Sequence, residues 1–162
     1  MGRFKNRVAL GSFMHYAVFS DIHGNFTSLE RFFTEVRDIV DQYFCLGDMV
    51  QYGNSFDENR CVELVQRNQC LTVRGNHEDK VLANYQQSLK KMYPQNLDYL
   101  ASLSSSLVIE PQYFLVHAPS GQRIISDAQA GEEFSKLPLG VEICFFGHSH
   151  QPSLFSKDKK GR

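Results

Sequence analysis

Five short apolar runs in this chain each end in aspartate, asparagine or histidine, and this feature restricts the fold more than any other. The first run, at residues 16–19, leads directly into Ser20-Asp21-Ile22-His23-Gly24-Asn25. The later runs lead, in chain order, into Asp48, into Asn76 and His77, into His117, and into His148 and His150. Buried parallel strands read as continuous apolar runs, and α/β proteins bind ligands outside the carboxyl ends of such strands. We therefore expect one sheet edge at which these side chains meet.

The order of the expected strands and helices predicts an α/β fold. Apolar runs at 14–20, 43–46 and 71–73 alternate with helical patterns, which favours parallel pairing of the strands. Asn25 is a helix-capping residue before an apolar stripe at 26–40, and Ser55 with Glu58 forms a capping box for the next helix. The remaining expectations are a helix over about 78–89, a connector ending at Pro94, a helix at 97–103, a serine loop at 104–106, a hairpin of 107–109 with 113–116, a helix around 130–137 and a last strand at 142–146.

Length and composition set the broad class of the protein. The 162 residues fit one domain, for which we expect the limits 14–155, with a loose leader at 1–13 and a basic tail at 156–162. The formal net charge of −1 gives no sign of a nucleic-acid or membrane surface, and no apolar stretch is long enough to span a bilayer. Four cysteines without a Cys-x-x-Cys pair are typical of reduced core thiols in a cytoplasmic protein. Nucleic acid is not expected as a partner, except as a small nucleotide substrate.

Five of the six histidines lie at the ends of apolar runs, and His15 is the exception. Each run taken alone could be a strand with a polar exit loop, but that interpretation does not account for five of them together. Aspartate, asparagine and histidine without thiolates suit divalent first-row metals and disfavour a structural zinc site. The candidate ligands are too many for one tetrahedral ion and fit two ions that share a carboxylate. Two such ions, about 3.5–4 Å apart, can clamp a phosphoryl group.

The motifs at these strand ends occur in a characteristic order: Asp21-x-His23, Gly47-Asp48, Gly75-Asn76-His77-Glu78, His117 and Gly147-His148-x-His150. Together they resemble the calcineurin-like metallophosphoesterase superfamily, and its small prokaryotic-type members in particular. The resemblance spans residues 21–150 and implies a four-layer αββα sandwich. It also implies further strands after the last motif, where this chain has twelve residues, so we expect a shortened second sheet. Apolar surface left there would favour a partner or a homo-oligomer.

The resemblance implies a dinuclear metal centre. The first ion would be bound by Asp21, His23 and His150 and the second by Asn76, His117 and His148, with Asp48 bridging the two. Manganese is the expected metal, with iron, zinc, cobalt and nickel as alternatives. A metal-bridging hydroxide would attack phosphorus in line, while His77 would bind the phosphoryl group and protonate the leaving group, assisted by Asn76. Arg74 is interpreted either as a phosphate-binding residue or as a surface cation.

Three positions depart from the family pattern. Gln51 and Tyr52 stand where the protein-phosphatase branch has an aspartate that orients the acid histidine and an arginine that grips phosphate. Ala118 replaces the usual glycine after His117, so its methyl group would narrow the site or shift the loop. The expected function is hydrolysis of a phosphomonoester or phosphodiester, with nucleotides, cyclic nucleotides or phosphoproteins as substrate classes, and Gln51 and Tyr52 disfavour protein-phosphatase activity. The alternatives are a catalytically silent binding scaffold and a truncated, poorly folding product; selectivity would come from segments 84–106 and 120–139, which contain no motif.

Overall fold

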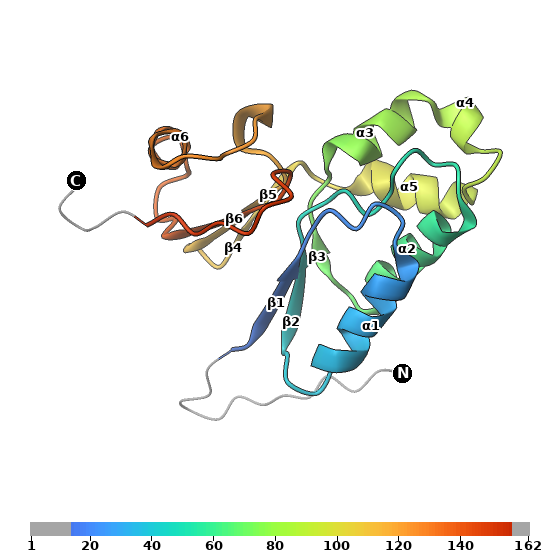
Figure 1. The fold of residues 1–162 in the computed structure, drawn as a ribbon, viewed down its shortest axis with the longest axis horizontal. Helices are drawn as coiled ribbons and strands as arrows, with labels where there is room; N and C mark the ends of the chain where they lie inside the picture. Colours follow the sequence, from blue (N-terminus) through green and yellow to red (C-terminus); the bar gives the residue numbers. More distant parts are fainter. Residues whose placement is uncertain (1–13, 157–162) are drawn as a thin grey trace.

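The first sheet is parallel and brings three strand ends to one edge. The computed structural model describes residues 14–156, so the predicted leader at 1–13 and the tail beyond residue 156 lie outside the described residues. The strands β1 (Tyr16–Phe19), β2 (Gln42–Cys45) and β3 (Leu71–Thr72) are arranged in the order β1-β2-β3 (Figure 1). In the parallel register Val18 lies opposite Phe44, and Phe44 lies opposite Leu71. The predicted alternation of parallel strands with helices is confirmed.

The helices between these strands begin at the predicted caps. They are α1 (Phe26–Val36) and α2 (Phe56–Arg67). The Asn25 side chain accepts a hydrogen bond from the Ser28 N–H at 3.1 Å, and Ser55 and Glu58 form the reciprocal capping box. The predicted apolar stripe extends to residue 40, but α1 ends at residue 36. Ile39, which belongs to that stripe, is 67% exposed, so a further turn would have no core to pack against.

Three helices follow the first sheet: α3 (Asn76–Ala83), α4 (Tyr85–Ser88) and α5 (Pro94–Ser102). α3 begins two residues earlier than expected, because the Glu78 carboxylate accepts the Gly75 N–H at 2.8 Å and satisfies the helix N-terminus. The helix expected to reach residue 89 is divided at Asn84, whose side chain donates to the backbone of the preceding turn. Pro94 starts α5 instead of ending a connector, which suits a residue without an N–H.

The second sheet is mixed. Its strands are β4 (Ser106–Ile109), β5 (Tyr113–Val116) and β6 (Ile143–Phe146), in the order β4-β5-β6. β4 and β5 form the predicted antiparallel hairpin, and β6 lies parallel to β5, with Phe145 opposite Leu115. A short 3-10 turn (Pro119–Gly121) and α6 (Asp127–Phe134) connect β5 to β6. Ser106, expected in a loop, instead pairs with Val116 at the start of β4.

The two sheets pack face to face, and helices cover both outer faces. Between the sheets, the buried side chains of Phe44, Leu46 and Val73 meet Leu115 of β5. A larger core lies between the first sheet and helices α1, α2, α3 and α5, which form one side of the molecule in Figure 1, while α6 lies on the other. The predicted four-layer αββα sandwich is confirmed. Its second sheet has three strands in the described part of the chain, in line with the expected shortening.

The four cysteines are free, as expected. Cys45 and Cys61 are fully buried, and burial raises the pKa of the Cys61 thiol to about 12. These two side chains therefore behave as small apolar groups in the core. Within residues 14–156, none of the helices combines the length and the apolar character that a membrane crossing requires.

Candidate metal centre

The backbone turns sharply at the positions of the candidate ligands. Five of them have positive φ angles: Asp21 (56°), His23 (49°), Asp48 (54°), His148 (68°) and His150 (57°). Residues with a Cβ atom rarely adopt this conformation, which costs about 1–3 kcal/mol at each position. Such strain persists only where the surrounding structure enforces it, and it gathers at active sites and ligand-binding loops. Gln69 and Glu110 also have positive φ angles elsewhere in the fold, but the concentration of five such residues at converging loops favours this sheet edge as the functional part of the molecule.

Two glycines allow the turns to approach one another. A Cβ atom at Gly75 would overlap with the carboxylate of Asp48, and a Cβ atom at Gly147 would overlap with the hydroxyl group of Ser20. The glycines of the Gly-Asn-His and Gly-His-x-His motifs are therefore required by contact between separate loops. Without that contact, donor atoms from different strands would not reach the same point.

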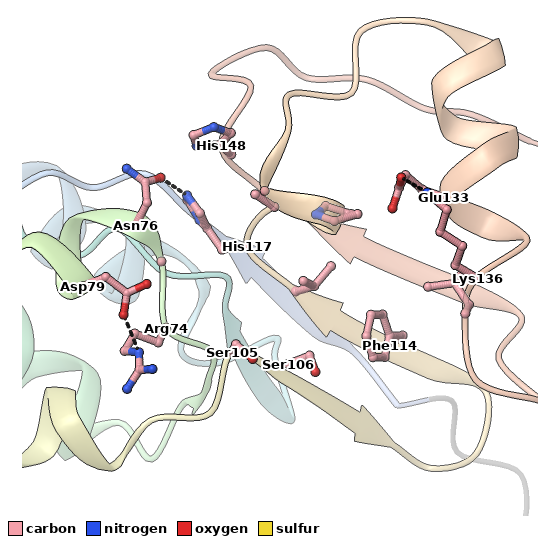
Figure 2. Close-up of a pocket in the computed structure, with 16 residues that line it drawn as sticks. Arg74, Asn76, Asp79, Ser105, Ser106, Phe114, His117, Glu133, Lys136 and His148 are labelled. Atoms are coloured by element: carbon pink, nitrogen blue, oxygen red, sulfur yellow. Dashed lines mark hydrogen bonds and ion pairs between the residues drawn. The ribbon is translucent and has the colours of Figure 1, made fainter.

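One group of converging donors surrounds His117. The His117 Nε2 atom lies 3.2 Å from Asp48 Oδ2 and 3.1 Å from Asn76 Oδ1. His148 completes this group, with its ring centroid 5.1 Å from that of His117 (Figure 2). Donor atoms bound at about 2.1 Å to a common ion are about 3.0–3.4 Å apart in octahedral or tetrahedral geometry. The spacing of the His117 group therefore fits one divalent ion.

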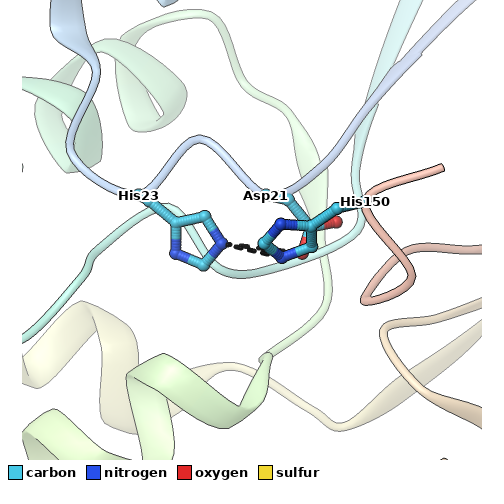
Figure 3. A group of neighbouring side chains, drawn as sticks. All are labelled: Asp21, His23 and His150. Carbon is cyan, nitrogen blue, oxygen red and sulfur yellow. Dashed lines mark hydrogen bonds and ion pairs between the residues drawn. The ribbon is translucent and has the colours of Figure 1, made fainter. Parts of the chain in front are cut away.

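A second group consists of Asp21, His23 and His150 (Figure 3). The Nε2 atoms of the two histidines lie 3.2 Å apart, and Asp21 Oδ1 lies 3.2 Å from His150 Nε2 and 3.7 Å from His23 Nε2. His23 and His150 are separated by 127 positions in the chain, so only the packing of the two sheets brings them together. Two of these three separations lie in the range expected around one ion, and the third is wider, so an ion bound here would draw Asp21 and His23 slightly closer together.

Asp48 lies between the two groups. Its Oδ2 atom is 3.2 Å from His117 Nε2 and 4.0 Å from His23 Nε2, while its Oδ1 atom accepts the His77 N–H at 2.9 Å. The carboxylate is 1% exposed, so its charge needs a positive partner. A buried carboxylate within reach of both donor groups is suited to bridge two ions.

Hydrogen bonds orient the donors that face the centre. His117 Nδ1 donates to the Leu46 carbonyl at 2.7 Å, so in the neutral ring Nε2, which faces Asp48 and Asn76, is the nitrogen that can bind a metal, while in the imidazolium Nε2 carries a proton that it donates to Asp48. Asp21 Oδ2 accepts the His148 N–H at 2.9 Å, which leaves Asp21 Oδ1 for the second group. Metal ligands typically have such outer partners, because these fix the tautomer of an imidazole and the orientation of a carboxylate.

The buried charges shift the pKa values of the central groups. Burial tends to raise the pKa of Asp48, but hydrogen bonds from His117 and from the His77 N–H outweigh it, and this pKa is lowered. Burial tends to lower the pKa of His117, but the hydrogen bond to Asp48 outweighs it, and this pKa is raised. Burial lowers the pKa of both His23 and His148. These two imidazoles are therefore kept neutral, which is the form that binds metal.

His77 lies at the edge of the centre, in the first turn of α3. Its ring is 4.6 Å from that of His23, and its Nδ1 atom is hydrogen-bonded to the main-chain carbonyl of Gln51. Gln51 stands where the protein-phosphatase branch has an aspartate, but the main-chain carbonyl of Gln51, and not its side chain, holds the His77 imidazole. The bond leaves His77 Nε2 free to exchange a proton with a bound molecule.

Two buried glutamates support the loops, and the sequence reasoning gave them no such role. Glu58 accepts hydrogen bonds from the five successive N–H groups of residues 51–55, at 2.8–3.2 Å. Glu78 accepts from the N–H groups of Asp48, Val50 and Gly75 at 2.7–3.2 Å, and burial raises its pKa. Both residues occupy the third position of a capping box, which was the available signal, but the box does not reveal the bonds to other loops.

Arg74 and Ala118 line a cavity beside the His117 group. The Arg74 guanidinium lies 2.8 Å from Asp79 Oδ1, and Figure 2 shows it turned away from Asn76. It would have to leave Asp79 to contact a bound phosphate. Ala118 has an extended backbone with φ −138°, a conformation open to any residue with a Cβ atom, and it borders the cavity.

Comparisons with known proteins identify several that are similar to this chain. An uncharacterized protein from Methanocaldococcus jannaschii is 30% identical over 161 aligned residues, which cover 88% of this chain and 65% of that protein. The crystal structure of a metallophosphoesterase from Sphaerobacter thermophilus superposes with a TM-score of 0.72 and 25% sequence identity. The superposition covers 86% of this chain and 62% of the Sphaerobacter chain. A proposed diadenosine tetraphosphatase shares the fold, with a TM-score of 0.54 and 21% sequence identity. This superposition covers 70% of this chain and 59% of the tetraphosphatase chain. The chain therefore spans less than two thirds of the length of each of these relatives.

The family described as calcineurin-like phosphoesterase matches residues 14–152, which include every strand and helix of the described structure. The match agrees with the αββα layers and spans all of the motifs at the strand ends. The chain belongs to the calcineurin-like phosphoesterase family.

Proposed function

We propose that this protein is a phosphoric ester hydrolase that uses two divalent metal ions, with manganese as the expected metal. The observation that carries the proposal is the pair of donor groups on either side of the buried Asp48 carboxylate, whose Oδ2 atom lies 3.2 Å from His117 Nε2 and 4.0 Å from His23 Nε2. Asp21, His23 and His150 would hold one ion, and Asn76, His117 and His148 the other. A cytoplasmic location and self-association through the second sheet are further parts of this proposal.

Two divalent ions would lower the pKa of a bound water molecule and neutralise phosphoryl oxygens, which is the chemistry that ester hydrolysis needs. The protein supplies the remaining steps. His77, held through Nδ1 by the Gln51 carbonyl, would give the proton on Nε2 to the oxygen of the leaving alcohol. The amide of Asn76, whose oxygen faces His117, has N–H groups left to stabilise charge on a phosphoryl oxygen. A silent binding scaffold is disfavoured, because it would not need a complete set of donors.

The proposal is tested with metal-stripped protein, to which manganese is returned, and with p-nitrophenyl phosphate and its bis-ester as substrates. Asp48→Asn should abolish metal-dependent turnover and also the rise in melting temperature on adding manganese. His77→Ala should keep that rise but lose about 10²–10⁴-fold in rate on esters of poor leaving groups. His15→Ala, an exposed histidine outside the centre, is the matched control. Turnover unchanged in Asp48→Asn would contradict the proposed metal centre.

The role of His77 as an acid has its own signature. Loss of a general acid affects an ester with a basic leaving group more than one with an acidic leaving group. His77→Ala should therefore slow phenyl esters more than the corresponding p-nitrophenyl esters. Equal losses on both would indicate that His77 binds the phosphoryl group without donating a proton.

A further inference from the structure

A cavity of about 440 Å³ opens beside the His117 group (Figure 2). Asn76, His117 and His148 lie at one end, and the cavity continues over the outer face of the second sheet towards α6. Its volume is within the range of about 300–1,000 Å³ that is typical of small-molecule sites. The cavity can therefore accept an organic group attached to a phosphate that is bound at the metal centre.

The floor of the cavity is apolar. Phe114 and Val116 of β5 flank Leu115, which is buried between the sheets, so the two outer residues face away from that core and into the cavity. Pro119 and Leu137 add to the apolar lining. An aromatic and aliphatic floor favours a ring system over a small alcohol such as methanol.

The two cations that line the cavity are already neutralised. Arg74 Nε lies 2.8 Å from Asp79 Oδ1, and Lys136 Nζ lies 2.9 Å from Glu133 Oε1, a second residue of the lining. A second phosphate group entering the cavity would have to displace a carboxylate or lie beside it. The charges therefore disfavour an anionic occupant and favour an uncharged one.

The proposed acid lies outside the cavity, on the other side of Asp48. His77 packs against His23, whereas the cavity borders His117 and His148. A leaving oxygen must come within hydrogen-bonding reach of the acid that protonates it. An organic group in the cavity is therefore the one that stays on phosphorus, which only a diester possesses.

We infer that the substrate is a phosphodiester whose retained group is an uncharged, ring-containing alcohol, such as a nucleoside, bound in this cavity. The inference rests on the proposed function. Water adds its oxygen to phosphorus, the bond from phosphorus to the second alcohol breaks, and His77 protonates the departing oxygen. A proton of the attacking water replaces the one that His77 gives up. The products are one free alcohol and the monoester of the group in the cavity.

Two diesters with the same leaving group test this inference. Thymidine 5′-(p-nitrophenyl phosphate) and methyl p-nitrophenyl phosphate both release p-nitrophenol and differ only in the retained group. With the manganese-loaded protein, the thymidine ester should have a kcat/KM about tenfold to hundredfold higher, as expected for a ring bound on an aromatic floor. A thymidine ester that carries an additional 3′-phosphate should be cleaved less efficiently than the ester without it.

Substitutions in the second sheet test whether the cavity causes the preference for the thymidine ester. Ser106→Trp at the start of β4 should fill the cavity and bring the ratio of the two kcat/KM values close to one. Phe114→Ala should also lower the ratio, and it covers the case in which the larger substitution disturbs folding. Val108→Trp is the matched control, since this residue lies on the same strand, is 52% exposed and does not line the cavity.

The outcomes separate this inference from the proposed function. Equal kcat/KM values for the two diesters, or a preference that Ser106→Trp and Phe114→Ala leave intact, would overturn the inference while the hydrolase activity stands. A preference for the ester with the additional phosphate would overturn the argument from neutralised charges. A folded, manganese-binding protein that cleaves p-nitrophenyl phosphate but neither diester would overturn this inference alone, whereas one that cleaves none of these esters would refute the proposed function, and this inference with it.

Discussion

Glu58 holds the loop that positions His77, and replacing it with glutamine should loosen that loop. The Glu58 Oε2 atom accepts the N–H groups of Gln51, Tyr52 and Gly53, and Oε1 accepts those of Asn54 and Ser55. A glutamine side chain has one oxygen, and its NH₂ group would face N–H donors. Glu58→Gln therefore removes at least two hydrogen bonds to a carboxylate and brings donors against one another.

The magnitude follows from these bonds. A hydrogen bond to a charged group contributes about 1.5–3 kcal/mol, so two of them would give about 3–6 kcal/mol if they were fully buried. Most of the bonds are only partly buried, which reduces the expected loss to about 2–4 kcal/mol. For a chain of this size that corresponds to a fall in melting temperature of roughly 4–16 °C. The Gln51 carbonyl should also lose its fixed position, and turnover should fall while manganese still binds.

Thermal denaturation and amide hydrogen exchange measure these effects. Amides 51–55 should exchange faster in Glu58→Gln, while the amides of the first sheet stay protected. Glu63→Gln, on the same helix and without a hydrogen bond to its carboxylate in the described part of the chain, is the control. A melting temperature equal to that of Glu63→Gln, with unchanged exchange at 51–55, would refute the assigned role of Glu58.

Three further predictions concern the metal centre. Gly75→Ala should lower the free energy of unfolding by about 1–3 kcal/mol and weaken manganese binding, because the new Cβ atom overlaps with Asp48. The control Gly131→Ala, in α6 with open space around it, should raise the free energy of unfolding by about 0.5–1 kcal/mol. Chemical denaturation measures the stability of both variants, and calorimetric titration measures their manganese binding. In metal-free protein, the lowered pKa of Asp48 stabilises the fold above about pH 3.9, and this stabilisation is lost as the pH falls through the pKa that Asp48 has in the folded state. The raised pKa of His117 stabilises the fold below about pH 6.5, and this stabilisation is lost as the pH rises through the pKa that His117 has in the folded state. The destabilisation caused by His117→Gln should thus be largest between these limits, and a loss that is flat across the range would contradict the assigned pair. Chelation should lower the melting temperature more at pH 8 than at pH 5.5, because protons compete with metal for the histidines, and scanning calorimetry at both values checks this.

Local patterns predicted the elements of this fold well. The caps at Asn25 and Ser55 act over three residues, so the sequence alone identifies where α1 and α2 begin. The boundaries at Val36 and Asn84 were missed because they depend on whether the core continues, or on which backbone group a side chain selects. The same limit applies to Ser106, whose strand pairing with Val116 is decided by the neighbouring strand.

The sequence by itself determined the residue types at the strand ends and the alternation of strands and helices, because hydrophobic periodicity and short motifs are local properties. The family and its αββα layers followed from the resemblance that those motifs carry. Only the tertiary structure decided how the donors meet. His23 reaches His150, and Glu78 reaches Asp48, across 127 and 30 positions, and these contacts arise from the packing of two sheets and from loops that cross without a Cβ atom between them. The position of the cavity over β5 was equally hidden, since alternation along a strand does not show what covers its outer face. Interactions between distant segments depend on the geometry of the whole fold, and no local pattern encodes them.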